Sequence, residues 1–126
     1  TSNQEVYSCG HNKFGQLGRD YGNVIGTNGA YSPVLQKIEL CNIIRIECAE
    51  LSSLCIDSSN NLFVFGCNEH GQLGLNDTNN RREPVKHPSL SNICDVSSKG
   101  DISLVKTLNN EIYGFGNNQY SQLGIK

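Results

Sequence analysis

The apolar residues of this chain fall in short runs, each bounded by polar residues that are typical of turns. The runs are rich in Ile, Val, Leu and Phe, which indicates β-strands, and no helix is expected between them. We predict strands at residues 6–9, 34–40, 43–46, 54–56, 62–65, 93–96, 103–105 and 112–115. The hydrophobic pattern therefore predicts an all-β fold.

A nine-residue signature with the frame G-x-N-x-x-[GS]-Q-L-G occurs three times, at residues 10–18, 66–74 and 116–124. Each copy follows one of the apolar runs directly. The positions that define the frame are Gly10, Asn12, Gln16, Leu17, Gly18, Gly66, Asn68, Gln72, Leu73, Gly74, Gly116, Asn118, Gln122, Leu123 and Gly124. The leading glycines are 56 and 50 residues apart, and a period of this length is typical of repeat architectures.

The segments between the signatures correspond to one another. Residues 112–115 match 62–65, 50 positions earlier, and Pro84 matches Pro33. On this alignment the second unit is shorter by five residues, all of them in the segment before the proline. Residues 19–32 and 75–83 are rich in Gly, Asn and polar side chains, so both are predicted to be loops.

A unit of four short strands that recurs about every 50 residues is typical of a β-propeller blade. A leucine-rich repeat is too short for this period. A WD40 repeat would contain a Trp-Asp pair, and a kelch repeat a double glycine; neither occurs here. We predict about two four-stranded blades over residues 1–126, which is an incomplete propeller.

The signature, an aromatic strand ending in Phe-Gly before it, and an Asn-Asn pair before that strand resemble the repeats of the regulator of chromosome condensation family. The resemblance covers essentially the whole chain and implies a propeller of about seven blades. Family repeats usually carry Gly and His before the aromatic strand, where this chain has Ala49 and Ser52, then Lys99 and Ile102. Ser121 also replaces the second glycine of the last signature.

The residue types of the signature predict a structural role. Gly66 permits a positive φ at the corner after the strand, and Asn68 is expected to bond its own backbone in the left-handed region. Gln72 can satisfy loop N–H and C=O groups, and Leu73 is expected to pack between blades, both largely buried. A phosphate-binding loop would need Lys-Ser/Thr after Gly71 and then a helix, and neither is present.

The charge balance and the cysteine content argue against several classes of function. Ten basic and twelve acidic residues give no electrostatic footprint for nucleic acid or an anionic membrane, and no apolar run is long enough for a transmembrane helix. Six cysteines without any C-x-x-C pair do not fit a zinc site. They are predicted to be free thiols that act as small buried hydrophobes, with disulfides as the alternative in a secreted chain. We expect no metal and no cofactor.

No catalytic motif accompanies the three scattered histidines, so we predict a non-catalytic, intracellular protein-interaction module, cytoplasmic or nuclear. The resemblance also implies two alternatives, an exchange factor for a small GTPase and an accessory region of a ubiquitin ligase. The candidate partner-binding residues lie in the two predicted loops and are Tyr21, Val24, Ile25, Tyr31, Arg81 and Arg82. Because the chain begins at Thr1 and has no methionine, we expect it to be a piece of something longer. Two complete units cannot close a propeller, so we expect either a longer propeller or association of copies that covers the open blade edges.

Overall fold

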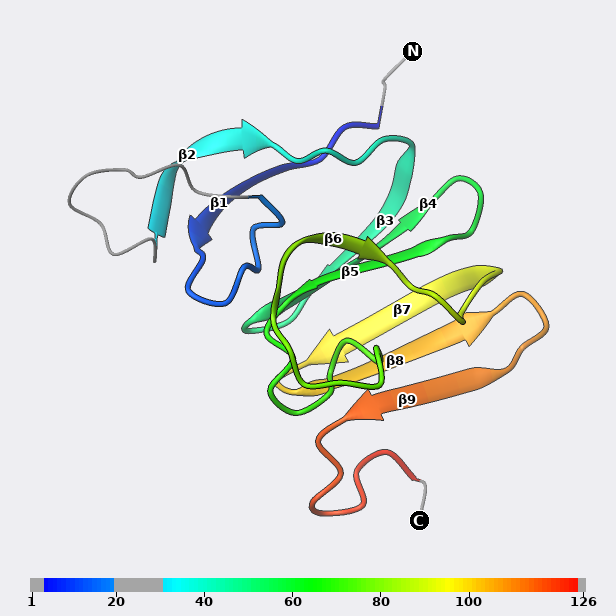
Figure 1. Ribbon diagram of the computed structural model, residues 1–126. Coiled ribbons are helices and arrows are strands. Elements are labelled where there is room, and N and C mark those ends of the chain that lie inside the picture. Colours follow the sequence, from blue (N-terminus) through cyan, green and yellow to red (C-terminus); the bar gives the residue numbers. More distant parts are fainter. Residues whose placement is uncertain (1–3, 20–30, 125–126) are drawn as a thin grey trace.

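The computed structural model describes residues 4–19 and 31–124, and within these ranges it contains nine β-strands and no helix (Figure 1). The strands are β1 (Tyr7–His11), β2 (Tyr31–Lys37), β3 (Ile43–Cys48), β4 (Ser52–Asp57), β5 (Leu62–Gly66), β6 (Arg81–Lys86), β7 (Ile93–Lys99), β8 (Ile102–Thr107) and β9 (Ile112–Gly116). The described part accordingly has no helix long and apolar enough to cross a bilayer.

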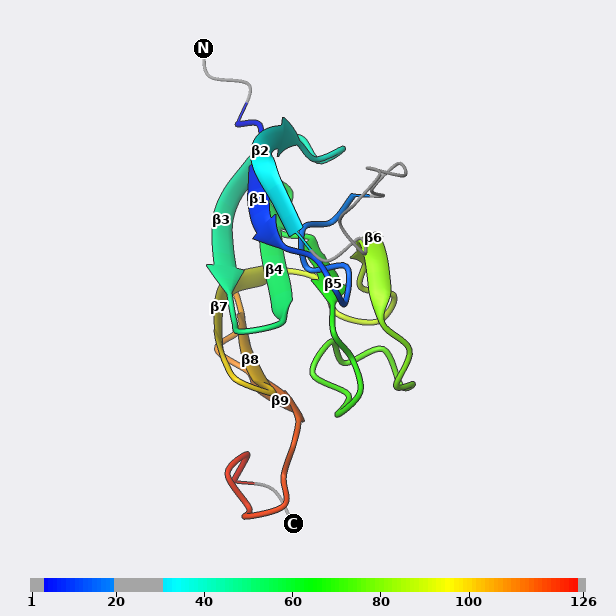
Figure 2. The ribbon, with the colours of Figure 1, turned by 90° about the vertical axis from the view of Figure 1, so that its left-hand side faces the viewer.

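The nine strands form three antiparallel sheets in the orders β1-β2, β3-β4-β5-β6 and β7-β8-β9. Figure 2 shows the sheets following one another along the molecule, each built from consecutive strands. The middle sheet has four strands, whereas within the described residues the first has two and the third has three. The fold is an incomplete β-propeller, as the sequence predicted.

The strands that follow the first and the second signature lie at other residues than the sequence predicted. The segment 75–83 was predicted to be loop, but β6 begins at Arg81 and pairs with β5. Likewise, the strand predicted at 34–40 runs from Tyr31 to Lys37. Backbone pairing with one neighbour is enough to hold an edge strand, so its side chains need not show an apolar pattern. The second signature therefore joins the third and fourth strands of the middle sheet, as the first signature joins β1 and β2, so one sequence repeat extends over two sheets.

The match of Pro33 with Pro84 is also wrong. Ser32 lies opposite Gly10 in the first sheet, and Arg81 lies opposite Gly66 in the second. Equivalent residues of β2 and β6 therefore differ by 49 in number, whereas the two prolines differ by 51. The seven extra residues of the first unit precede β2.

The core consists of two apolar clusters, one in each joint between neighbouring sheets. The first joint contains Val6, Ile38, Leu40, Ile43, Cys55 and Phe65. The second contains Leu54, Ile56, Leu62, Val64, Leu73, Ile93, Val96 and Val105. Some positions of the third sheet, such as Ile112 and Leu104, are open although they match buried positions of the second, because no further sheet covers them within the described residues. Leu62 is 0% exposed and its counterpart Ile112 is 69% exposed.

Asparagines shape the turns between strands, as the sequence predicted for residues 57–61. Asn60 has a φ of 62°, and Asp57 Oδ1 accepts hydrogen bonds from the N–H groups of Ser59 and Asn61. Asn60 also bonds the next sheet, since its Nδ2 donates to the carbonyl oxygen of Ile93 at 3.0 Å. This turn therefore fixes the position of one sheet relative to the next.

Candidate interaction surface

The asparagine of the signature makes the same hydrogen bond in all three copies. Its Oδ1 accepts the N–H of the leucine five residues later, at 3.0 Å for Asn12, 2.9 Å for Asn68 and 2.9 Å for Asn118. Asn68 was expected in the left-handed region, but its φ is not positive. Its side chain closes the loop by itself, so the backbone needs no unusual conformation there.

The glutamine of the signature closes the inside of the loop. Its Oε1 accepts the N–H two residues earlier, at 3.0 Å for Gln16, 3.0 Å for Gln72 and 2.8 Å for Gln122. In the second copy Nε2 also donates to Asp101 Oδ1 at 3.1 Å, in the turn between β7 and β8. The second glutamine therefore ties its loop to the next sheet.

The expected burial of the second signature is confirmed. Gln72 and Leu73 are both 0% exposed, and Leu73 belongs to the cluster that contains residues of both neighbouring sheets. In the third copy Gln122 is exposed and Leu123 is half-buried. The frame residues thus have a structural role. They are buried where another sheet follows the signature, and more exposed where no described sheet follows it.

Gly66 shows why the frame begins with glycine. Its φ is +105°, and a Cβ atom at this position would come 2.5 Å from the carbonyl oxygen of Leu51 in the neighbouring turn. Both the conformation and the close approach exclude a side chain.

Three of the six candidate partner-binding residues, Tyr21, Val24 and Ile25, lie outside the described residues. Tyr31 was predicted in the same loop, but it lies in β2, where its side chain is 60% exposed. Its ring meets the ring of His11 edge-on, with the centroids 5.0 Å apart.

Arg81 and Arg82 were predicted in a loop and lie in β6, with different environments. Arg81 Nη2 is 2.6 Å from Asp77 Oδ2, and this contact is the largest cause that lowers the pKa of Asp77. Asn68 Nδ2 donates to the other oxygen of Asp77 at 3.0 Å. Arg81 therefore holds the segment before β6 in place, whereas the Arg82 side chain is exposed and makes no hydrogen bond or ion pair with the described residues.

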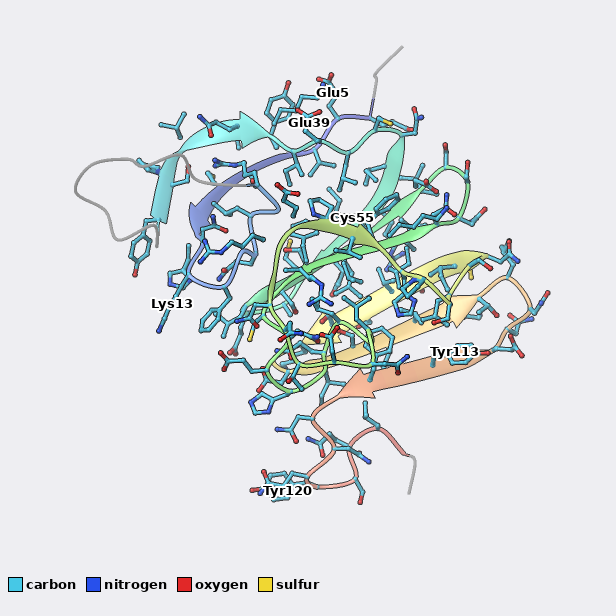
Figure 3. All side chains as sticks on the ribbon, in the orientation of Figure 1. Glu5, Lys13, Glu39, Cys55, Tyr113 and Tyr120 are labelled. Atoms are coloured by element: carbon cyan, nitrogen blue, oxygen red, sulfur yellow. The ribbon has the colours of Figure 1, made fainter. Side chains whose placement is uncertain are left out.

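Around the first signature lie three exposed side chains, Lys13, Tyr31 and Arg82, and two half-buried ones, His11 and Phe14. Gly15 packs so closely on β6 that a Cβ atom there would lie 2.5 Å from the Cα of Arg82. Next to it, Lys13 Nζ lies 5.2 Å from the centroid of the Phe14 ring. We use the name first-loop surface for His11, Lys13, Phe14, Tyr31 and Arg82. Figure 3 shows Lys13 at the outside of the molecule.

Sequence reasoning missed His11, Lys13 and Phe14 as members of this surface. Lys13 and Phe14 occupy the two adjacent variable positions of the frame, where the other copies have Glu69-His70 and Gln119-Tyr120. The signal was that variation inside a strict frame. The contact between the loop and β6 could not be inferred, because the strand itself was not predicted.

The described residues offer no group of three or more His, Cys, Asp or Glu side chains that could hold a metal ion. All six cysteines are free thiols, but only Cys55 and Cys67 are buried. Burial raises the pKa of Cys55 to about 12, so this thiol is inert. The prediction that the cysteines act as buried hydrophobes is wrong for Cys9, Cys41, Cys48 and Cys94.

His87 is a buried histidine that the sequence left without a role. Its Nδ1 faces the N–H groups of Ser89 and Leu90, which can only donate, at 3.4 and 3.1 Å. The proton must therefore sit on Nε2, which lies 2.9 Å from the carbonyl oxygen of Gly74. Burial is the main cause that lowers the pKa of His87, and the bond to Gly74 opposes it. The neutral ring thus fixes the end of the second signature.

Comparison with known families gives two matches to models described as the regulator of chromosome condensation (RCC1) repeat, over residues 59–105 and 93–122. Together they span just over half of the chain. Protein RCC2 homolog of Danio rerio is 41% identical over 76 residues, which are 60% of this chain and 14% of that protein. Probable E3 ubiquitin-protein ligase HERC4 of Homo sapiens is 35% identical over 86 residues, 66% of this chain and 8% of that protein.

Solved structures share the fold. Yeast RCC1 (Prp20) in complex with Kap60 superposes with a TM-score of 0.87 at 19% identity, over 100% of this chain and 31% of that chain. A second structure, of Prp20p from Saccharomyces cerevisiae, gives a TM-score of 0.81 at 20% identity, over 98% of this chain and 32% of that one. The chain thus spans about a third of Prp20 and much less of the two curated relatives.

Proposed function

Because the chain belongs to the RCC1 repeat family, we propose that it is a non-catalytic part of a propeller that binds a protein partner through the first-loop surface. The observation behind this proposal is that the frame residues of the repeat have structural contacts, whereas the residues beside them are free to contact a partner. The frame residues are occupied by hydrogen bonds inside the fold. The side chains of Lys13, Tyr31 and Arg82, in contrast, are exposed beside them.

The chemistry of the first-loop surface favours an acidic partner with an apolar contact residue. Lys13 and Arg82 are cationic, and arginine is well suited to bidentate contacts with carboxylates. Tyr31 offers a large ring with few rotatable bonds, and the contact with His11 further restricts it. The rigid support beneath these groups is the packing of the first signature on β6.

The proposal is tested with the double variant Tyr31→Ser/Arg82→Glu as bait in quantitative affinity purification. Partners that bind wild type should be lost with the variant. Binding of one such partner, once purified, should weaken at least tenfold in calorimetry, because about 1–3 kcal/mol is expected per truncated anchor residue. Lys106→Glu is the charge-matched control, since Lys106 is exposed on β8, in a different sheet. Equal weakening by the control, or unchanged binding by the double variant, would count against the proposal.

A second candidate is guanine-nucleotide exchange on a small GTPase. It is favoured by the printed description of the Prp20p structure, which refers to binding properties to Gsp1p and histones. At 20% identity the similarity to Prp20p shows that the two chains share a fold, but it does not show that they share an activity. A purified small GTPase loaded with fluorescent GDP distinguishes the two candidates. Accelerated release would support exchange, whereas binding without acceleration would support the interaction module.

A third candidate is the accessory region of a ubiquitin ligase, which rests on the similarity to HERC4. The sequence of the whole protein tests it, because a ligase domain would be recognised there. For the interaction module proposed first, we further propose an intracellular location, cytoplasmic or nuclear, and no direct binding of nucleic acid. Fluorescence imaging of the tagged protein and a filter-binding assay with duplex DNA test these two points.

A further inference from the structure

The second position of the signature accepts a hydrogen bond from the glutamine of its own loop in the first and third copies. Gln16 Nε2 lies 2.8 Å from His11 Nδ1, and Gln122 Nε2 lies 3.4 Å from Asn117 Oδ1. An amide oxygen accepts such a bond at any pH, whereas an imidazole nitrogen accepts it only while it carries no proton. Histidine changes its charge between pH 5 and pH 8. The first loop therefore contains an acceptor that acid can remove.

The proton of the neutral His11 ring can be assigned from the groups around Gln16. The main-chain N–H of Phe14 can only donate, and its nitrogen lies 3.0 Å from Gln16 Oε1. This bond orients the Gln16 amide so that its NH2 group faces His11. Because an NH2 group also only donates, Nδ1 of His11 must be unprotonated and the proton lies on Nε2. The neutral ring thus fits the closed loop.

A protonated His11 ring does not fit the loop in the same way. Uptake of a proton from solvent places an N–H on Nδ1, which would then face the NH2 group of Gln16 at 2.8 Å. If the Gln16 amide turns over, its oxygen meets His11, but the N–H of Phe14 loses its acceptor. If the ring of His11 turns away instead, it leaves the edge-on contact with Tyr31. Phe14 and Tyr31 belong to the first-loop surface, so either response changes that surface.

The charged and titratable groups around His11 do not relieve this conflict. Tyr31 meets the ring from β2, Lys13 lies in the same loop, and Arg82 lies on β6, which packs against the loop. Lysine and arginine have no acceptor for the additional N–H. None of the ion pairs formed by the described residues includes His11. The protonated ring can therefore regain a hydrogen bond only by a change in the loop or by turning towards solvent.

We propose that protonation of His11 switches the first-loop surface from a form that binds its protein partner to a form that binds it more weakly. This inference rests on the proposed function and names a regulation of the same surface. The protonated ring also adds a positive charge that attracts an acidic partner, but an exposed ion pair changes affinity by about fivefold at most. Displacement of an aromatic anchor costs about fivefold to a hundredfold, so the change of shape outweighs the added charge.

NMR spectroscopy between pH 7.5 and pH 5.5 tests the switch without a partner. At pH 7.5 the ring nitrogen shifts of His11 should report a proton on Nε2. As the ring takes up its second proton, one of two signals should change. Either the protection factor of the Phe14 amide in hydrogen exchange falls about fivefold, the effect of one lost hydrogen bond, or the nuclear Overhauser contact between the His11 and Tyr31 rings disappears. A proton on Nδ1 at pH 7.5, or both signals unchanged after protonation, would overturn the proposal.

His11→Asn is the matched variant, because Asn117 shows that asparagine accepts the glutamine bond at this position. In this variant the Phe14 amide should keep its protection factor over the whole pH range. The probe for binding is a partner isolated with the wild-type protein as bait and then purified. Its affinity for wild type should weaken about threefold or more between pH 7.5 and pH 5.5, whereas the two affinities of His11→Asn should agree within about twofold. An equal pH dependence of the two proteins would overturn the proposal.

His70→Asn is the control for a histidine elsewhere in the chain. His70 lies in the second signature, where its Nε2 is 3.6 Å from Asp101 Oδ2, outside the first-loop surface. This variant should keep the pH dependence of wild type, and its loss would assign the effect to the second signature and overturn the proposal. Partners that bind Tyr31→Ser/Arg82→Glu as tightly as wild type would refute the proposed function, whereas unchanged NMR signals would refute only the switch.

Discussion

The ring of Phe65 lies against Gly18, so closely that a Cβ atom on Gly18 would come 2.7 Å from the ring. Gly74 has the same relationship with Phe115, at 3.0 Å. The last glycine of each of these signatures therefore accepts the aromatic side chain of the next sheet. This contact links motif positions that are 47 residues apart in the first pair and 41 residues apart in the second.

The contact predicts that Gly18→Ala is more destabilising than its backbone conformation alone requires. Gly18 has a φ of +67°, which by itself costs an alanine about 1 kcal/mol, and the added methyl group must also displace the Phe65 ring. We expect a total loss of about 2–4 kcal/mol in the free energy of unfolding, measured by urea denaturation.

Gly124→Ala is the matched control. Gly124 has a φ of +66° and a Cβ atom there would meet nothing within 4 Å. It should lose only the conformational part, about 1 kcal/mol. Equal losses in the two variants would show that the ring contact contributes nothing to stability.

Ser121, which replaces a glycine of the frame, has a backbone conformation that is unfavourable for a residue with a side chain. It has a φ of 59°, in the left-handed region where the other two copies have Gly15 and Gly71. Ser121→Gly should therefore stabilise the chain by up to about 1 kcal/mol, because relief of the strained backbone outweighs the extra entropy of glycine when unfolded. The gain should appear as a raised thermal midpoint.

Gln119→Gly serves as the comparison for Ser121→Gly, since Gln119 is exposed in the same loop and its φ is not positive. There glycine should destabilise by about 0.5–1 kcal/mol. A gain in both variants would mean that the loop as a whole favours glycine, and not that Ser121 is strained.

The sequence predicted best where structure is local. The frame identified the loops, and the apolar runs identified eight of the nine strands, with β2 displaced by three residues. It failed for β6, because a strand that begins Arg-Arg-Glu is held by main-chain bonds to β5 rather than by burial. The same failure hid the ion pair of Arg81 with Asp77 and the exposure of Arg82 beside the first signature. Contacts between sheets depend on blade geometry, which no single repeat encodes.

His87 predicts a dependence of stability on pH. Its pKa in the folded state is lower than the ordinary value of 6.5, so the unfolded chain binds the proton more readily. The contribution of His87 to stability is therefore fully present above about pH 6.5 and decreases as the pH falls below it. Protonated Nδ1 would also face the N–H groups of Ser89 and Leu90, which explains the direction.

Urea midpoints measured between pH 7.5 and pH 5 for wild type and His87→Gln test this behaviour. The variant should be less stable at pH 7.5, because it loses the bond to Gly74, and its stability should fall less on acidification. Parallel curves for the two proteins would refute a role for His87 in the acid sensitivity.

The last prediction concerns a glutamine that is chemically identical in two copies of the signature but differently buried. Gln72 is 0% exposed and its Nε2 donates to Asp101 Oδ1, whereas Gln122 is exposed. Gln72→Leu should lose about 1–3 kcal/mol of unfolding free energy, since it removes the acceptor of the part-buried His70 N–H and one donor to Asp101. Gln122→Leu breaks the same bond inside its loop, but water can replace it, so the loss should stay below about 1 kcal/mol. Equal losses would mean that the glutamine acts only within its own loop; a larger loss at Gln72 would establish that this frame position also fixes one blade to the next.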